Sequence, residues 1–472
     1  MILETLTDEL RRILGDRMSL SKAVREHHSR GESHHDPHLP DVVVFPESTD
    51  EVQAIVRACA RHRTPMVPYG AGSSLEGHVV PVRGGVSVDM SRLSRIVRIH
   101  IEDLDVTVEA GVTRKQLERH LQSTGLTFPL DPGADATIGG MASTRASGTT
   151  AVRYGTMREA VLGLTVVLAD GRIVHTGSRA RKSSSGYDLT RLFVGAEGTL
   201  GIITEVTLRL HGRPEAVAAM TCSFETIDAA VETVIAIVQL AIPVARIELL
   251  DEVQMDAVNR HSRLAYRVAP TLFFEFHGLS DADVSGHAEA ACEIAREHGA
   301  RDLARALTPE NRATLWQARH DAYFAALALR PGSRGWTTDV CVPISRLAEC
   351  IRETKGDVDA SPLTGALVGH VGDGNFHMIF PVKPEAPEEI AEAQRLTDRL
   401  VERALALGGT CSGEHGVGLG KMRFLEAEHG RAALDVMRAI KQSLDPHNLM
   451  NPGKLLPDLS DERQSATVNR PH

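Results

Sequence analysis

The stretch that is most informative about the fold class of this chain is rich in glycine and serine: Pro68-Tyr69-Gly70-Ala71-Gly72-Ser73-Ser74-Leu75-Glu76-Gly77. Apolar residues at 42–45 and 66–68 predict two strands, and the periodicity of 49–62 predicts an amphipathic helix between them. The backbone amides of such a loop can donate to a diphosphate, because no bulky side chain obstructs its approach. An ordinary surface loop explains the stretch equally well, so both interpretations stay open at this point.

The stretch does not match the fingerprint of a nicotinamide-dinucleotide fold. After Gly70 and Gly72, that fingerprint requires a third glycine at the position of Leu75, and no helical pattern begins there. We therefore expect any phosphate bound by this loop to be held by a different fold.

Similar segments of small residues recur farther along the chain, next to predicted strands. Residues 161–168 and 173–176 predict a hairpin around Asp170-Gly171, and 203–210 predict another strand. The segments are more numerous than turns require, which indicates a binding site for a long dinucleotide. They are Asp131-Pro132-Gly133, Thr137-Ile138-Gly139-Gly140-Met141-Ala142-Ser143, Ser147-Gly148-Thr149, Arg153-Tyr154-Gly155 and Glu197-Gly198-Thr199-Leu200-Gly201-Ile202-Ile203.

A second group of reactive side chains lies in Gly369-His370-Val371-Gly372-Asp373-Gly374-Asn375-Phe376-His377 and in Ser412-Gly413-Glu414-His415-Gly416. The apolar flanks of the first stretch predict two strands, and the turn between them lets its two histidines converge. Together with Glu414 they form the ligand set of an open divalent metal site, and His415 then remains as a base. In a chain with 22 histidines, either pair alone could also be an accidental neighbour.

Composition excludes several classes of protein. The 472 residues fit two or three domains, and the formal net charge of -10 gives no basic surface for nucleic acid or an anionic membrane. Six scattered cysteines indicate reduced thiols, and residues 1–15 lack the pattern of a signal peptide. The apolar run at 233–245 is too short to span a membrane. We expect a cytoplasmic protein, with peripheral attachment to a membrane as the alternative.

Taken together, these motifs resemble the flavin domain of the vanillyl-alcohol-oxidase superfamily. From about residue 40 to 456, the chain resembles the branch of FAD-linked D-lactate, glycolate and D-2-hydroxyglutarate dehydrogenases, which includes the flavoprotein component of glycolate oxidase. Asn451-Pro452-Gly453-Lys454 belongs to the same pattern. The resemblance implies an α+β fold: a two-part FAD-binding domain of the PCMH/VAO type, and an α+β cap domain built on an antiparallel sheet.

The resemblance also implies roles for individual residues. His370, His377 and Glu414 would bind a divalent metal, Zn²⁺ or Mn²⁺, and His415 would be the catalytic base. A metal on the substrate oxygens lowers the hydroxyl pKa while the imidazole accepts the proton. The residues expected to bind FAD are Pro68, Gly70, Ala71, Gly72, Ser73, Ser74, Gly77, Pro132, Gly133, Thr137, Ile138, Gly139, Gly140, Ser143, Ser147, Gly148, Tyr154, Glu197, Gly198, Gly201, Ile202, Ile203 and Asn451.

The substrate site is expected in the cap. Residues 310–329 predict one long helix on which Arg319 and Tyr323 share a face, and Arg319 resembles the family's clamp for the substrate carboxylate. Relatives acting on 2-hydroxyglutarate carry a lysine and an asparagine where this chain has Thr337 and Ile379, with Trp336 alongside. A second carboxylate would meet an apolar wall, which favours D-lactate or another small or aliphatic D-2-hydroxy acid. Glycolate and D-2-hydroxyglutarate are the alternatives within the family.

The predicted division is a helical segment at 1–39, an FAD-binding domain at 40–211, a cap with the metal site at 212–445, and a return to the FAD domain with a polar tail at 446–472. Electrons would leave to a cytochrome, a quinone or an electron-transfer flavoprotein, and the chain could form a homodimer. A zinc hydrolase is the alternative from another class, although it leaves the glycine-rich segments unexplained.

Overall fold

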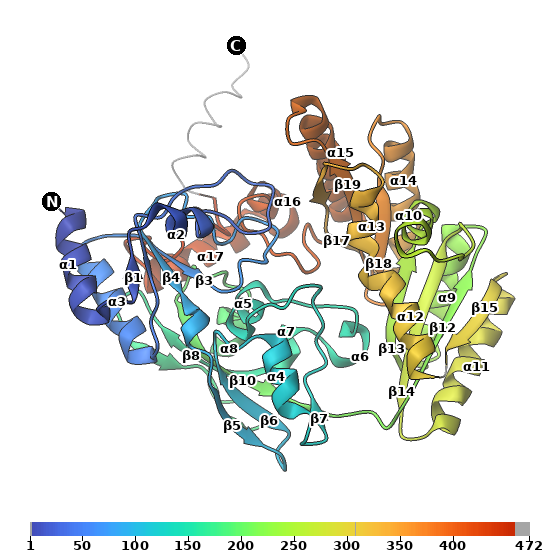
Figure 1. The fold of residues 1–472 in the computed structure, drawn as a ribbon, viewed down its shortest axis with the longest axis horizontal. Coiled ribbons are helices and arrows are strands. Elements are labelled where there is room, and N and C mark those ends of the chain that lie inside the picture. Colours follow the sequence, from blue (N-terminus) through green and yellow to red (C-terminus); the bar gives the residue numbers. More distant parts are fainter. Residues whose placement is uncertain (1, 307, 458–472) are drawn as a thin grey trace. The chain divides into compact units, whose positions relative to one another are not determined.

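The computed structural model describes residues 2–306 and 308–457, which form two compact units (Figure 1). The first unit comprises the described parts of Met1–Ala146, Thr156–Gly212 and His415–His472. The second comprises Ser147–Gly155 and Arg213–Glu414. This grouping differs from the predicted division, because 147–155 pack with the second unit, whereas the N-terminal segment and the chain from His415 onward pack with the first. The predicted polar tail at 458–472 lies outside the described residues.

The first unit begins with a small sheet in the strand order β1-β2-β4-β3. Strands β2, β4 and β3 are parallel, and α3 connects β2 to β3. Ser48 caps α3 by accepting a hydrogen bond from the Glu51 amide, as its hydroxyl and position favour. The predicted strand, helix and strand are thus confirmed. The bounds are β1 (Met18–Ser19), β2 (Val42–Val44), α3 (Thr49–Arg61), β3 (Met66–Tyr69) and β4 (Val86–Asp89).

A five-stranded antiparallel sheet, in the order β5-β6-β10-β8-β9, forms the other part of this unit. The predicted hairpin around Asp170-Gly171 is confirmed as β8 and β9. The flavin domain is therefore two-part, as expected. The bounds are β5 (Ile96–His100), β6 (Asp105–Glu109), α4 (Arg114–Leu121), β7 (Leu126–Thr127), α5 (Ile138–Thr144), α7 (Met157–Ala160), β8 (Val161–Val167), β9 (Ile173–His175), α8 (Leu189–Phe193), β10 (Ile202–Arg209), β11 (His211–Gly212), α16 (Leu425–His429) and α17 (Arg431–Leu444).

The N-terminal segment is part of the first unit rather than a separate body. Helix α1 (Ile2–Leu14) buries Leu6, Leu10 and Leu14, which recur every four residues, in the core that also contains α3. After α2 (Lys22–His27), the buried His28 places Nε2 2.8 Å from Asp89 Oδ2. The sequence from 27 to 38 contains five histidines and would be expected to form a solvated loop, but at least the His28 imidazole is internal.

The second unit is built on an eight-stranded sheet in the order β15-β12-β14-β13-β18-β19-β16, with β17 paired to β19. Every pairing in it is antiparallel, which confirms the predicted architecture of the cap. The strands are β12 (Ala216–Ser223), β13 (Val244–Leu250), β14 (Thr271–Gly278), β15 (Arg301–Ala306), β16 (Arg334–Thr337), β17 (Val340–Cys341), β18 (Ala366–His370) and β19 (Asn375–Val382).

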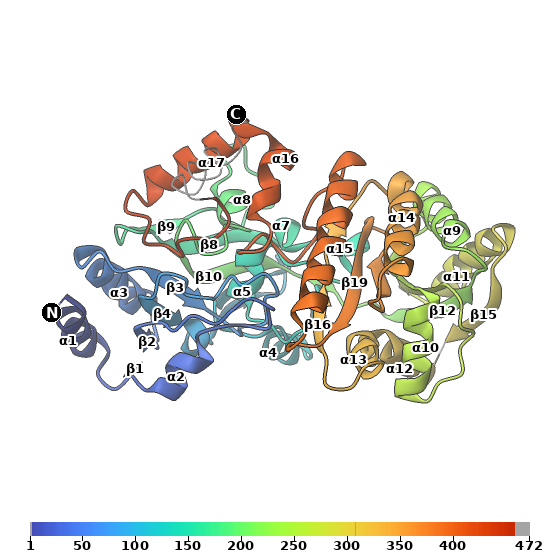
Figure 2. The same ribbon diagram turned by 90° about the horizontal axis from the view of Figure 1, so that it is seen from above.

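Helices cover both faces of this sheet (Figure 2). Helices α9, α11, α14 and α15 lie on one side, and α10, α12 and α13 lie on the other. Apolar side chains from α12 and α13 pack with Leu250 and Phe273 of the sheet. The bounds are α6 (Ala151–Tyr154), α9 (Ile227–Gln239), α10 (Glu252–Ser262), α11 (Asp281–Glu297), α12 (Pro309–His320), α13 (Ala322–Ala328), α14 (Leu347–Asp359) and α15 (Pro387–Ala406).

The single helix predicted for 310–329 is wrong, because the chain forms α12 and α13 with Asp321 between them. The Asp321 carboxylate accepts hydrogen bonds from Ser262 Oγ at 2.7 Å and from Gln317 Nε2 at 2.6 Å. A short polar side chain with such partners favours a helix end over a helix interior. Arg319 and Tyr323 consequently lie on different helices, so the expected i,i+4 relation does not place them on one face.

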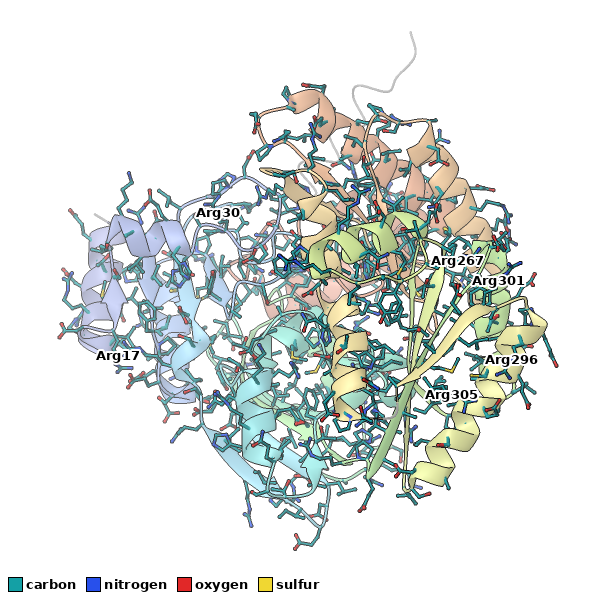
Figure 3. All side chains as sticks on the ribbon, turned by 45° about the vertical axis from the view of Figure 1, so that its right-hand side comes forward. Arg17, Arg30, Arg267, Arg296, Arg301 and Arg305 are labelled. Carbon is teal, nitrogen blue, oxygen red and sulfur yellow. The ribbon has the colours of Figure 1, made fainter. Side chains whose placement is uncertain are left out.

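Charged side chains occupy the open edge of the sheet at β15. Figure 3 shows Arg267, Arg296, Arg301 and Arg305 around β15 and α11. Arg267 and Arg301 pair with Glu225, and Arg296 and Arg305 pair with Glu289. Charges along an edge strand oppose pairing with another chain. None of the helices in 2–306 and 308–457 is long and apolar enough to cross a membrane.

Candidate active site

The two histidines predicted to converge lie on one β-hairpin. In the register of β18 and β19, His370 is opposite Asn375 and His377 is opposite Val368, so both imidazoles project from the same face. Their ring centroids are 5.5 Å apart. Gly374 has φ +80°, and a Cβ there would lie 2.1 Å from the Val342 carbonyl oxygen, so this turn requires glycine. The predicted strands and turn are confirmed.

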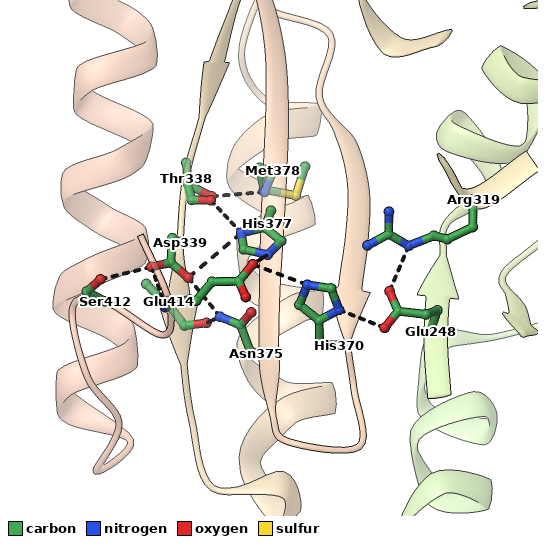
Figure 4. Close-up of polar contacts among 11 residues, drawn as sticks. Glu248, Arg319, Thr338, Asp339, His370, Asn375, His377, Met378, Ser412 and Glu414 are labelled. Carbon is green, nitrogen blue, oxygen red and sulfur yellow. Dashed lines mark hydrogen bonds and ion pairs between the residues drawn. The ribbon is translucent and has the colours of Figure 1, made fainter. Parts of the chain in front are cut away.

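Glu414 completes the group within the second unit (Figure 4). Its Oε1 lies 3.2 Å from His370 Nε2 and 3.2 Å from His377 Nε2. One ligand atom from each of the three residues lies within 4.8 Å of the others. The structure therefore brings together the three predicted metal ligands.

The other ring nitrogens determine which tautomers face Glu414. His370 Nδ1 lies 2.6 Å from Glu248 Oε1, and His377 Nδ1 lies 2.9 Å from the carbonyl oxygen of Thr338. Because both partners are acceptors, each Nδ1 carries the proton and each Nε2 of a neutral ring presents a lone pair to Glu414. Two lone pairs and a carboxylate oxygen around one point repel one another unless a cation lies between them.

The local electrostatics favour positive charge at this point. Burial by itself lowers the pKa of His370, but the carboxylates of Glu248 and Glu414 raise it to about 10. Burial by itself raises the pKa of Glu414, yet the two imidazoles bring it well below its usual range. Without a metal the group holds a proton in the cation's place.

The distances fit a divalent metal. Two ligands about 2.1 Å from one ion and 3.2 Å apart subtend about 100° at the ion, between the octahedral and tetrahedral angles. Two imidazole nitrogens and one carboxylate leave coordination positions for substrate oxygens. His370, His377 and Glu414 can therefore hold Zn²⁺ or Mn²⁺.

Asp339 positions the loop that carries Glu414, and no sequence motif points to it. Its carboxylate accepts hydrogen bonds from the Glu414 amide at 3.0 Å, from Ser412 Oγ at 2.9 Å and from Asn375 Nδ2 at 2.8 Å. Asp339 is 1% exposed. The sequence does hold one sign of this role: Asp339 is the single charged residue in 336–342. Buried carboxylates are rare unless they are paired, so such an acid is expected to have partners.

The predicted carboxylate clamp, Arg319, is linked to the metal group through one intervening side chain, Glu248. Its Nε donates to Glu248 Oε2 at 2.7 Å, and Glu248 in turn contacts His370 (Figure 4). Glu248 is fully buried and was not predicted. The alternation of Arg246 and Glu248 with apolar residues on β13 was a signal, because it places two charges on one face of a buried strand.

Two of the five predicted substrate residues, Thr337 and Ile379, are neighbours on the face of His377. Thr337 is opposite Ile379 in the β16–β19 register, and Ile379 is two residues from His377. Trp336 projects from the opposite face, where its Nε1 donates to Thr397 Oγ1 of α15 at 2.9 Å. Its placement beside Thr337 in the pocket is therefore wrong, because adjacent residues of a strand alternate in direction. Tyr323 lies over Gly335 of β16, where a Cβ would be 2.5 Å from the tyrosine hydroxyl.

The predicted flavin loop of the first unit contains unsatisfied donors. Within 2–306 and 308–457, the backbone amides of residues 71–75 donate no hydrogen bond, and Ser74 Oγ is buried without a partner. Gly70 approaches Thr137, since a Cβ there would lie 2.4 Å from Thr137 Oγ1. Orphaned donors and a side-chain-free approach fit the diphosphate of FAD.

Glu197 and Asn451, also predicted to bind FAD, have internal partners. Glu197 accepts from the amides of Val417 at 2.7 Å and Gly418 at 2.9 Å. Asn451 Nδ2 donates to the carbonyl oxygens of His78 and Glu197. These two side chains tie the C-terminal part of the first unit to its earlier segments, and a role in FAD binding stays a prediction.

The remaining predicted residues are divided between the two units. Ser147, Gly148 and Tyr154 belong to the second unit, where the Tyr154 hydroxyl lies 2.8 Å from His277 Nδ1. His415 belongs to the first unit. In the first unit, Thr137 caps α5, which contains Ile138, Gly139, Gly140 and Ser143. Also in that unit, Pro68 lies in β3, Ile202 and Ile203 lie in β10, and Gly77, Pro132, Gly133, Gly198 and Gly201 lie in connections.

Comparisons with known proteins agree with this fold and with binding of FAD. The family described as "FAD linked oxidases, C-terminal domain" matches residues 213–455, and the family described as "FAD binding domain" matches residues 40–177. The chain belongs to the FAD-linked oxidases and is a flavoenzyme that uses FAD.

Particular relatives are similar over nearly the whole chain. The probable mitochondrial D-lactate dehydrogenase of Danio rerio is 52% identical, covering 96% of this chain and 92% of the relative. The mitochondrial D-lactate dehydrogenase (cytochrome) of Arabidopsis thaliana is 46% identical, covering 96% and 80%. The structure of p-cresol methylhydroxylase with substrate bound has a TM-score of 0.81 at 18% identity, covering 97% and 98%, which shows a shared fold.

Proposed function

We propose that this enzyme oxidises a small D-2-hydroxy acid, D-lactate, to the 2-oxo acid, with FAD and a divalent metal as cofactors. The observation that carries the proposal is the convergence of His370 Nε2, His377 Nε2 and Glu414 Oε1, with each histidine's Nδ1 held by an acceptor. The names of the relatives support D-lactate as the substrate.

The chain's own residues divide the work. His370, His377 and Glu414 would hold the metal, which would polarise the substrate oxygens and lower the hydroxyl pKa. His415, next to Glu414 in sequence, accepts the hydroxyl proton. FAD, when bound, is the acceptor for the hydride that leaves C2 of the substrate. Arg319 binds the substrate carboxylate through its terminal nitrogens, because Nε is occupied by Glu248.

The pocket residues favour a monocarboxylate. Thr337 and Ile379 are cross-strand neighbours on the face that carries His377, and neither offers a positive charge. A second carboxylate against the buried Ile379 would lose its hydration without gaining a partner. D-lactate has only a methyl group at that position.

The name of one relative also supports a class of electron acceptor. The Arabidopsis thaliana relative is named for a cytochrome, which supports an external cytochrome as the acceptor here, with a quinone or an electron-transfer flavoprotein as alternatives. A cytoplasmic location and a homodimer remain predictions for localisation experiments and for sedimentation.

An anaerobic titration tests the proposal. Purified protein reconstituted with FAD is titrated with D-lactate or L-lactate while the visible spectrum is recorded, before and after dialysis against a chelator. We expect D-lactate alone to bleach the flavin, and we expect chelated protein to stay yellow until Zn²⁺ or Mn²⁺ is restored. Bleaching that survives complete removal of metal contradicts the metal's role, and a flavin indifferent to D-lactate contradicts the substrate.

A further inference from the structure

The fully buried carboxylate of Glu248 lies between two residues of the proposed site. On β13, Leu249 is paired with Gly369, so Glu248 lies beside His370 on the neighbouring strand. One carboxylate oxygen contacts His370 Nδ1 at 2.6 Å, and the other accepts from Arg319 Nε at 2.7 Å (Figure 4). Glu248 is 0% exposed, so water does not compete for either contact.

Each contact constrains one partner. With Nδ1–H donated to Glu248, the His370 ring is fixed in direction, its Nε2 keeps the lone pair that binds a metal, and the ring becomes a stronger ligand. Because the Arg319 Nε–H group donates to Glu248, the orientation of the guanidinium plane is fixed. Within 2–306 and 308–457, Glu248 is the only side chain that forms a hydrogen bond with Arg319, so its terminal nitrogens remain available to a ligand.

We propose that Glu248 is a positioning residue that sets both the metal affinity of His370 and the affinity of Arg319 for the substrate carboxylate. This inference rests on the proposed function and assigns a role to a residue that touches neither metal nor substrate. One buried carboxylate can hold both partners because each of its two oxygens accepts one hydrogen bond.

The decisive variant is Glu248→Gln, which keeps the volume of the side chain. An amide has one acceptor oxygen and one NH₂ group, so it cannot accept from both His370 and Arg319. Binding of Zn²⁺ and of Mn²⁺ is measured on the flavin-containing protein by competition with a chromogenic chelator, without turnover. We expect affinity to fall about 10- to 100-fold and the KM for D-lactate to rise about tenfold. Glu248→Asp retains both acceptors on a shorter side chain and should recover part of the affinity.

The neighbouring strand offers a matched control in Glu275. Its carboxylate is also buried between a histidine and an arginine, with His277 Nε2 at 2.8 Å and Arg246 Nε at 3.4 Å. Both contacts are to Glu275 Oε1, so Glu275→Gln removes a buried negative charge from the same sheet without touching His370. We expect it to change thermal stability and to leave metal affinity unchanged.

The outcomes separate this inference from the proposed function. Metal affinity of Glu248→Gln within twofold of wild type, or an equal loss in Glu275→Gln, overturns the positioning role. If wild-type protein binds neither ion, the metal in the proposed function and this inference both fail. If the affinities change as expected but wild-type protein does not oxidise D-lactate, the substrate proposal fails and the positioning of His370 stands.

Discussion

Replacing Glu197 with glutamine tests how the first unit holds the segment that follows Glu414 and His415. The Glu197 carboxylate is 4% exposed and accepts hydrogen bonds from the amides of Val417 and Gly418 at 2.7 and 2.9 Å. His78 Nε2 lies 3.2 Å from the same carboxylate. The charged group thus accepts from two amides, one on each oxygen, next to an imidazole, which its isosteric amide cannot do.

The magnitude follows from these contacts. A hydrogen bond to a charged group contributes about 1.5–3 kcal/mol, and a buried donor left without a partner costs about 1–3 kcal/mol. The glutamine oxygen can keep the hydrogen bond from one backbone amide. Its NH₂ group then faces the other amide, and two donors cannot bond to each other. We expect local stability of 417–418 to fall by about 2–4 kcal/mol, which is about 30- to 1,000-fold in the opening equilibrium.

Hydrogen exchange of peptides spanning 415–421 measures this loss directly. The matched control is Glu109→Gln, because Glu109 is also a buried carboxylate of the first unit and accepts from the Arg95 amide at 2.8 Å. That variant should leave exchange at 417–418 unchanged. Protection of these amides that persists in Glu197→Gln would refute the view that the carboxylate holds the segment.

Three further outcomes are expected. His377→Ala should keep the visible spectrum of bound FAD but reduce the rate of anaerobic bleaching by D-lactate at least about 100-fold, because an open metal site loses one of three ligands; an unchanged rate contradicts the metal site. Thr337→Lys, which places an ammonium beside Ile379, should raise the ratio of kcat/KM for D-2-hydroxyglutarate to that for D-lactate about tenfold, and a constant ratio contradicts the pocket argument. Burial lowers the pKa of Lys454 to about 8. Between about pH 8 and 10.4 the unfolded chain therefore binds more protons than the folded protein, so wild-type stability rises with pH by about 3 kcal/mol. Lys454→Met should lose that rise in urea unfolding measured across the same range, and an identical pH profile contradicts the assignment.

Local patterns predicted the features that depend on near neighbours. The turn between β18 and β19 fixes their register, so the convergence of His370 and His377 could be inferred from their spacing and the glycines between them. The hairpin around Asp170-Gly171 and the helix at α3 followed from the same kind of signal. The interruption of the helix at Asp321 could not be predicted in this way, because Asp321 bonds to Ser262 of a different helix. That tertiary contact overrides the local helical periodicity.

Short motifs and periodicity in the sequence were enough to predict the family, the two-part flavin domain, the antiparallel cap and the three candidate metal ligands. The residues that hold these candidate ligands become apparent only in the packed fold. Glu248 reaches His370 across 122 positions of chain, and Asp339 reaches Glu414 across 75. Such pairs are set by strand order and register, which arise when apolar faces from distant segments pack together, and no local pattern contains that information.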